Sequence, residues 1–187
     1  MKKILFINAC VRPNSRTRDL TKSVLEKLSG SVEEVKLYEQ DLSPLDLKGM
    51  EERDLAHKNK DFSSSTFALA RQFKSADSIV IATPYWDLSF PAVVKSYFEK
   101  VTVNGLTFAY GEDGRPYGLC KAKRLIYVTT AGGPIIYNFG YDYVTALAKN
   151  FYGINQVQCI KAETLDVKGS NATEILQNAK SSINIEK

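Results

Sequence analysis

Three short apolar runs constrain the fold of this chain more than any other feature of its sequence. They are Lys3–Asn8, Ser78–Ala82 and Leu125–Thr130, and each is followed by a polar loop. A strand with apolar residues on both faces must be covered by helices on both sides, which is typical of a parallel sheet. Parallel strands also need long crossover connections, so helices are expected between them.

The segments between these strands carry apolar residues at helical spacing. The expected helices are Thr17–Leu28, Thr66–Ser75, Pro91–Thr102, Tyr141–Tyr152 and Thr173 to the C-terminus. Two further strands are expected at Ser31–Tyr38, whose charged residues indicate a sheet edge, and at Gln156–Ile160. This alternation predicts an α/β fold with helices on both faces of a five-stranded parallel sheet in the order 2-1-3-4-5.

Two segments interrupt the alternation. Gln40–Ser65 is polar and contains Pro44, Gly49 and the only histidine, His57, so we interpret it as a mobile surface excursion with a solvated histidine. After the helix that follows the third strand, residues 106–119 predict an inserted hairpin, because two short strand patterns flank the turn sequence Gly-Glu-Asp-Gly.

Composition limits the functions that this chain can have. Its 187 residues, 44% hydrophobic and 25% charged, indicate one globular domain. The net charge of +4 comes from scattered residues, which does not indicate nucleic-acid binding. Three distant cysteines without a C-x-x-C pair favour neither a disulfide scaffold nor a metal site. No apolar run is long enough for a membrane span or a signal peptide, so we expect a cytoplasmic protein.

The first strand ends in a loop suited to phosphate. In a sheet of this order, ligands bind between the loops that follow the first, third and fourth strands. The loop Ala9–Thr17 enters a helix N-terminus, whose free N–H groups and positive dipole end attract anions. Arg12, Ser15 and Arg16 add cationic and hydroxyl donors. We therefore predict a phosphate site, with a capped helix and solvated arginines as the alternative.

The other two loops suit a flat conjugated ring. Thr83–Pro91 contains Tyr85 and the only tryptophan, Trp86, which can stack on a ring or, equally, cover the sheet end or a subunit contact. Asp87 and backbone N–H groups of the same loop can address the polar edge of the ring. The glycine pair in Thr129–Pro134 lets the backbone approach a ligand closely, although such pairs also occur in ordinary turns.

Four segments of the sequence resemble one known family. They are Asn8–Thr17, Pro84–Glu99, Gly105–Tyr110 with Gly118-Leu119, and Thr129–Gly133. These segments are similar to the FMN-dependent NADH-azoreductases and the wider flavodoxin-like NAD(P)H:quinone reductases, and the similarity extends over nearly the whole chain. The resemblance implies a flavodoxin-like three-layer sandwich and a single FMN-binding domain over residues 1–187.

The same resemblance implies a homodimer with tightly bound FMN at the subunit interface. Hydride would pass from NADH or NADPH to the flavin and then, in ping-pong order, to a quinone, azo or nitroaromatic acceptor. Because the flavin carries this chemistry, neither a catalytic side chain nor a metal is predicted. Phe108 on the hairpin and Ile135 would border the substrate pocket. The implied cofactor-binding residues are Arg12, Ser15, Arg16, Thr17, Pro84, Tyr85, Trp86, Asp87, Leu88, Thr130, Ala131, Gly132 and Gly133.

Three positions depart from the family pattern. Ala9 stands where a serine is frequent, Asp87 where an asparagine is common, and Ile135 about where some members carry a histidine. These differences concern the identity of the substrate more than the binding of flavin.

Two other functions fit parts of the sequence. Cys10 and Arg16 form a C-x5-R pattern that resembles the low-molecular-weight tyrosine phosphatases, in which a cysteine thiolate attacks a bound phosphate. That family also needs an aspartate followed by proline as general acid, and no Asp-Pro occurs in this chain. A flavodoxin electron carrier is disfavoured because such proteins are usually acidic, whereas this chain carries +4. The reductase remains the favoured interpretation.

Overall fold

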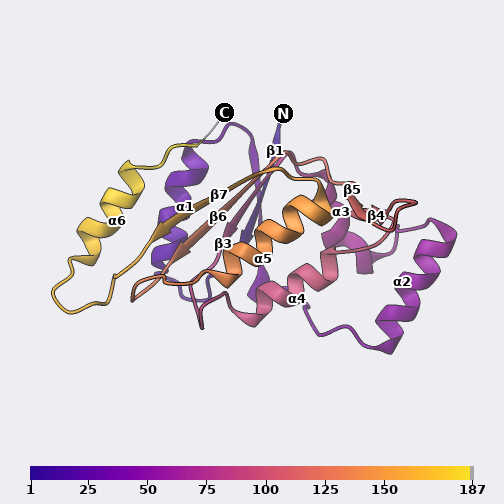
Figure 1. Ribbon diagram of the computed structural model, residues 1–187, viewed down its shortest axis with the longest axis horizontal. Coiled ribbons are helices and arrows are strands. Elements are labelled where there is room, and N and C mark those ends of the chain that lie inside the picture. Colours follow the sequence, from indigo (N-terminus) through magenta and orange to yellow (C-terminus); the bar gives the residue numbers. More distant parts are fainter. Residues whose placement is uncertain (186–187) are drawn as a thin grey trace.

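Five parallel strands form the centre of the computed structural model, which describes residues 1–185 (Figure 1). They are β1 (Lys3–Asn8), β2 (Ser31–Lys36), β3 (Ser78–Ala82), β6 (Arg124–Thr130) and β7 (Gln156–Ala162). Their order is β2-β1-β3-β6-β7, which confirms the predicted order 2-1-3-4-5. β1, β3 and β6 are almost wholly buried, as their apolar runs require, whereas β2 lies at an edge and exposes most of its residues.

Helices cover both faces of this sheet and complete a three-layer sandwich (Figure 1). On one face lie α1 (Arg16–Glu26) and α6 (Ala172–Ser181), and on the other α3 (Ala68–Ser75), α4 (Ala92–Val101) and α5 (Phe139–Leu147). Each predicted helix is present with small shifts of its ends. The expected last helix ends at Ser181 rather than at the C-terminus, and residues 186–187 lie outside the described residues.

The polar segment Gln40–Ser65 contains a helix, α2 (Leu47–Asn59), that is not predicted from its sequence. Two turns of 3-10 helix, η1 (Leu37–Glu39) and η2 (Ser65–Phe67), flank α2. Asp46 caps α2 by accepting a hydrogen bond from the Gly49 N–H at 2.8 Å. The helix buries only Ala56, so its sequence shows no apolar stripe. Arg53 fixes it to the fold by donating to backbone carbonyls at the C-terminal end of α4.

The inserted hairpin packs against an irregular turn of helix. It consists of β4 (Phe108–Tyr110) and β5 (Pro116–Gly118), paired antiparallel as predicted. After α5 the chain continues as a π-helical turn, η3 (Ala148–Tyr152), which ends at Gly153 in the left-handed region with φ 72°. Phe108 packs edge-on against Phe151, with ring centroids 4.9 Å apart. The hairpin is thus joined to the main core.

The described residues lack a membrane-spanning helix, a metal-binding cluster and a disulfide among their three cysteines. None of the helices within residues 1–185 combines the length and the apolar character needed to cross a bilayer. The same residues contain no group of three or more His, Cys, Asp or Glu side chains placed to hold a metal ion. Cys10, Cys120 and Cys159 form no disulfide with one another.

Candidate functional site

A cavity of about 290 Å³ lies at the carboxyl ends of the central strands. This is the position at which sheets of this strand order bind ligands, because the chain leaves β1 and β3 toward opposite faces. The volume is near the lower end of the range of roughly 300–1,000 Å³ that is common for small-molecule sites. The lining residues are Cys10, Val11, Arg12, Asn14, Ser15, Arg16, Thr17, Pro84, Tyr85, Trp86, Thr130, Ala131, Gly132 and Asp166.

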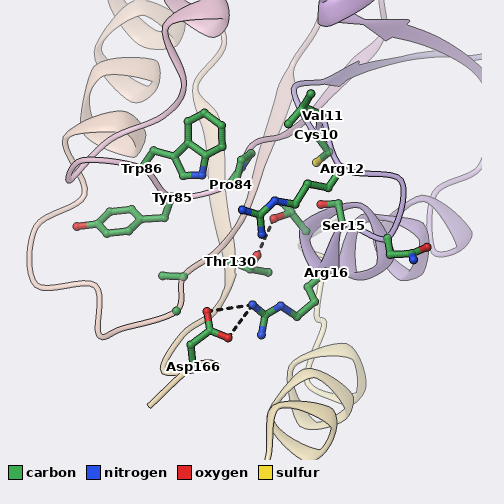
Figure 2. A pocket seen from close by; sticks show the side chains of 14 residues that line it. Cys10, Val11, Arg12, Ser15, Arg16, Pro84, Tyr85, Trp86, Thr130 and Asp166 are labelled. Carbon is green, nitrogen blue, oxygen red and sulfur yellow. Dashed lines mark hydrogen bonds and ion pairs between the residues drawn. The ribbon is translucent and has the colours of Figure 1, made fainter. Parts of the chain in front are cut away.

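The N-terminus of α1 forms one wall of the cavity. Ser15 is the N-cap residue, and its hydroxyl accepts a hydrogen bond from the Arg18 N–H at 3.3 Å. The N–H groups of Arg16 and Thr17 have no acceptor within residues 1–185, as expected for a first helical turn. The Arg12 side chain extends from this wall across the cavity (Figure 2). This wall therefore presents free donors and positive charge to an anionic group.

Buried hydrogen bonds join the three loops that meet at the cavity. The hydroxyls of Thr17 and Thr130 lie 2.6 Å apart and form a buried hydrogen bond between α1 and the end of β6. The Thr130 carbonyl accepts a hydrogen bond from the Tyr85 N–H at 3.0 Å. Because Thr130 is hydrogen-bonded both to Thr17 of α1 and to Tyr85, it holds the N-terminus of α1 and the aromatic loop in a fixed relative position.

Tyr85 and Trp86 form the opposite, aromatic wall (Figure 2). The Tyr85 hydroxyl donates to the Tyr137 carbonyl at 2.7 Å, and the Phe139 N–H donates to the Leu88 carbonyl at 3.0 Å, which ties this loop to the start of α5. Trp86 remains 41% exposed, so part of its side chain is open to a ligand. An exposed aromatic surface beside a polar cradle suits a flat ring that carries an anionic tail.

The aromatic loop contains a strained two-residue turn. Trp86 and Ser89 exchange two backbone hydrogen bonds, of 3.1 and 2.8 Å, around Asp87 and Leu88. Both central residues have positive φ, 51° for Asp87 and 64° for Leu88, as a type I′ turn requires. Aspartate tolerates this conformation, but a leucine there costs about 1–2 kcal/mol. The N–H groups of Asp87 and Leu88 have no acceptor within the described chain.

Replacing Leu88 by glycine should stabilise the fold. The change removes the steric strain of a positive φ, partly offset by the greater freedom of glycine in the unfolded chain, so we expect a gain of about 0.5–1 kcal/mol. Urea unfolding at equilibrium measures this difference. Leu55→Gly is the control, because Leu55 is also exposed but lies in the helix α2. It should destabilise the protein by about 1 kcal/mol, and a loss of stability in Leu88→Gly would contradict the assignment of strain.

A fourth loop reaches the cavity and was not expected from the sequence. It follows β7 and contributes Asp166, whose carboxylate oxygens lie 2.9 and 3.1 Å from one guanidinium nitrogen of Arg16 (Figure 2). In sheets of this order the ligand site is expected between the loops after β1, β3 and β6, so the loop after β7 is not included. The only signal in the sequence was that β7 neighbours β6 and ends at the same edge of the sheet.

The structure brings most of the predicted cofactor residues together. Ten of the thirteen line the cavity, namely Arg12, Ser15, Arg16, Thr17, Pro84, Tyr85, Trp86, Thr130, Ala131 and Gly132. Asp87, Leu88 and Gly133 are not among the lining residues; Asp87 and Gly133 directly follow lining residues, and Leu88 lies two positions after Trp86. Of the two residues expected at a substrate pocket, Ile135 donates its N–H to Glu163 at 2.8 Å, and Phe108 is only 6% exposed. The hairpin instead exposes Tyr110 and Tyr117.

The environment of Cys10 does not favour the phosphatase alternative. Burial raises the pKa of the Cys10 thiol above its ordinary value, and this exceeds the opposing effects of the Ser15 hydrogen bond and the Arg18 charge. A thiol with a raised pKa is a poor nucleophile at neutral pH. In addition, Arg16, the arginine of the C-x5-R pattern, is bound to Asp166. Cys10 is therefore interpreted as a small, partly buried side chain in the cavity wall rather than as a nucleophile.

Comparison with protein families agrees with this geometry. A family model described as "Flavodoxin-like fold" matches residues 2–184. The FMN-dependent NADH:quinone oxidoreductase 2 of Clostridium acetobutylicum is 34% identical, with 95% of this chain and 94% of that protein aligned. The FMN-dependent NADH:quinone oxidoreductase of Coprothermobacter proteolyticus is 32% identical, with 96% and 94% aligned.

Solved structures show the same fold. An FMN-dependent NADH-azoreductase from Bacillus anthracis, solved in complex with FMN, superposes with a TM-score of 0.77 at 25% identity, covering 97% of this chain and 95% of that one. A second azoreductase from Bacillus anthracis gives a TM-score of 0.81 at 23% identity, with 97% and 96% covered, which supports the fold alone.

Proposed function

This chain belongs to the flavodoxin-like family that includes the FMN-dependent NADH:quinone oxidoreductases, and we propose that it is itself an FMN-dependent NAD(P)H:acceptor oxidoreductase. The acceptors we propose are quinones, azo compounds and nitroaromatic compounds. One observation carries the proposal: a single cavity joins a phosphate-type helix N-terminus to an aromatic wall. The phosphatase alternative is not favoured, because its cysteine and arginine are not arranged for attack on a phosphate.

The residues present fit FMN. The free N–H groups at the start of α1, the Ser15 hydroxyl and the Arg12 guanidinium are donors for a phosphate dianion. Tyr85 and Trp86 offer the apolar surface that a conjugated ring system needs. The free N–H groups of Asp87 and Leu88, within the described residues, suit the polar edge of such a ring. We propose that these loops, with Thr130 to Gly133, hold the cofactor.

The protein contributes position and shelter to the reaction. Bound FMN would supply the redox chemistry: it would accept two electrons from NAD(P)H as a hydride and pass them to the acceptor. The hydrogen bond from the Tyr85 hydroxyl to the Tyr137 carbonyl holds the aromatic wall in place. The Thr17–Thr130 hydrogen bond holds the N-terminus of α1 beside the end of β6. The exposed side of Trp86 leaves one space for a flat substrate. Because donor and acceptor would use that space in turn, we propose a ping-pong order.

We also propose a homodimer that covers the mouth of the cavity. Large apolar side chains gather there without cover, namely Trp86, Leu88, Ile136, Tyr137 and Phe139. The Tyr137 and Phe139 rings are stacked, with an interplanar angle of 2°. An exposed apolar group of this kind commonly marks a protein interface. In such a dimer, Tyr110 and Tyr117 are the hairpin aromatic side chains available to a partner, because Phe108 is buried.

We propose that the protein acts in the cytoplasm. Cys10, Cys120 and Cys159 are unpaired with one another, and unpaired cysteines are usual in a reducing compartment.

A visible absorption spectrum tests the proposed function directly. The purified chain is mixed with FMN, desalted, and then given NADH or NADPH without oxygen. We expect retained flavin absorption that bleaches on addition of a nicotinamide donor, and the faster donor identifies the preferred coenzyme. A quinone added afterwards should restore the oxidised spectrum. Protein that emerges from desalting without flavin would refute the proposal.

A further inference from the structure

The cavity contains one acidic side chain in a place that is otherwise arranged for an anion. Of its lining residues in the described chain, Asp166 is the only acid, whereas Arg12 and Arg16 are cationic. A carboxylate in such a site repels a phosphate unless a neighbouring cation balances its charge. The Asp166 side chain is 64% exposed, so solvent reduces this repulsion. The role of Asp166 therefore depends on the groups that it contacts directly.

The backbone holds the Asp166 loop firmly against the loop that follows β6. The Thr164, Leu165 and Asp166 N–H groups donate to the carbonyls of Gly133, Ala131 and Gly132 at 3.0, 3.2 and 2.9 Å, respectively. A Cβ atom on Gly132 would lie 2.5 Å from the Oδ2 of Asp166, so the glycine leaves the room that the carboxylate occupies. The backbone position of Asp166 is therefore fixed by the fold, and Gly132 leaves room for its side chain.

Asp166 draws Arg16 toward the far end of the cavity. One terminal nitrogen of Arg16 donates to both Asp166 oxygens, and the other donates to the Leu165 carbonyl at 3.4 Å. Both terminal nitrogens are thus engaged on the loop after β7. Arg12, by contrast, has no hydrogen-bond acceptor or acidic partner within residues 1–185 (Figure 2).

We propose that Asp166 is a positioning residue that withholds Arg16 from the cofactor phosphate, so that Arg12 and the N–H groups of α1 bind the phosphate without it. This inference rests on the proposed FMN site. Arg16 is held at the wall beside Gly132, and its charge is balanced there by the carboxylate. The balanced pair limits how much tighter a phosphorylated flavin binds than the same flavin without its phosphate.

The test compares FMN with riboflavin, which lacks the phosphate. The dissociation constant of each flavin is measured from the quenching of its fluorescence, and the ratio of the two constants gives the phosphate preference. In Asp166→Asn, Arg16 is released and can join the phosphate. We expect the preference for FMN to rise roughly three- to fivefold, as for a partly exposed charge pair.

A double variant shows whether Asp166 acts through Arg16. Arg16→Ala alone should change the preference by less than about twofold, because water screens the unpaired carboxylate, and adding Asp166→Asn to it should also change the preference by less than about twofold. An increase that persists without Arg16 would mean that the carboxylate repels the phosphate directly, and it would overturn the proposal. No increase in Asp166→Asn alone would overturn it as well.

One control variant makes the test specific to the pair between Asp166 and Arg16. Asp113→Asn breaks an exposed pair with Arg115 on the hairpin, at 3.7 Å, and should leave the preference unchanged. Failure of the unaltered chain to bind either flavin would refute the proposed function itself. If the unaltered chain binds FMN and only the effect of Asp166→Asn is missing, the function stands and this inference is wrong.

Discussion

Replacing Gly118 by alanine should lower the free energy of unfolding by about 3–5 kcal/mol, among the largest effects expected from a single methyl group. Gly118 ends β5 where the hairpin meets the π-helical turn η3. A Cβ atom there would lie far inside van der Waals distance of the Tyr152 carbonyl and the Gly153 nitrogen. Both are backbone atoms, so no side-chain rotation relieves the overlap.

The surrounding core prevents the backbone from moving aside. Tyr152 is fully buried, its ring lies 4.8 Å from that of Phe73, and its hydroxyl is hydrogen-bonded to Thr102. A shift of η3 would therefore disturb the packing of Tyr152 against Phe73 and its hydrogen bond to Thr102. Thermal unfolding should show a midpoint lower by roughly 10 °C, from the slope of about 2–4 °C per kcal/mol for a domain of this size.

Gly111→Ala is the matched control for this prediction. Gly111 lies in the same hairpin, and a Cβ atom there meets only the flexible Asp113 side chain at 3.0 Å and the Arg115 carbonyl at 3.7 Å. It should change stability by less than about 1 kcal/mol. If Gly118→Ala were equally mild, the close approach of β5 to η3 would not be required by the fold.

The sheet could be predicted from the sequence because burial on both faces leaves a direct signature. β1, β3 and β6 are uninterrupted apolar runs, and the charged residues of β2 mark an edge strand. Short-range patterns of this kind depend only on which residues are buried. Strand order then followed from the helical crossovers, for which parallel sheets permit few arrangements.

The helix α2 could not be predicted in the same way. Its apolar residues Leu47, Met50 and Leu55 are exposed, so no periodic stripe exists. Its position depends on contacts between Arg53 and the end of α4, which is more than forty residues away along the chain. A periodic apolar pattern marks the buried face of a helix, and α2 buries only Ala56.

The candidate site was predicted in part, for a similar reason. The loops after β1, β3 and β6 follow from the strand order, and Trp86 and Arg12 stand out by residue type. Asp166 belongs to no motif, and it lies 150 residues from its partner Arg16. The close contact between Gly118 and η3 is likewise invisible in the sequence, because it depends on a π-helical turn that no local pattern indicates.

Replacing Arg12 by alanine should have the largest effect on cofactor binding. Arg12 lines the cavity, and within residues 1–185 it has no hydrogen-bond or ion-pair partner that would compete for its guanidinium. Charge-assisted hydrogen bonds contribute about 1.5–3 kcal/mol each, which corresponds to a loss of roughly 10- to 150-fold in affinity for FMN. Riboflavin, which has no phosphate, should lose less than about threefold. Titration of the flavin fluorescence measures both values.

The dependence on salt and a second arginine make this prediction specific. The affinity of the unaltered chain for FMN should fall as ionic strength rises, because salt screens attraction between exposed charges, and the fall should be shallower in Arg12→Ala. Arg115→Ala removes the same charge from the exposed hairpin and should bind FMN normally. Equal losses for FMN and riboflavin in Arg12→Ala would mean that Arg12 supports the shape of the loop. In that case the phosphate would depend on the N–H groups of α1 alone, and the division of roles between Arg12 and Arg16 would be wrong.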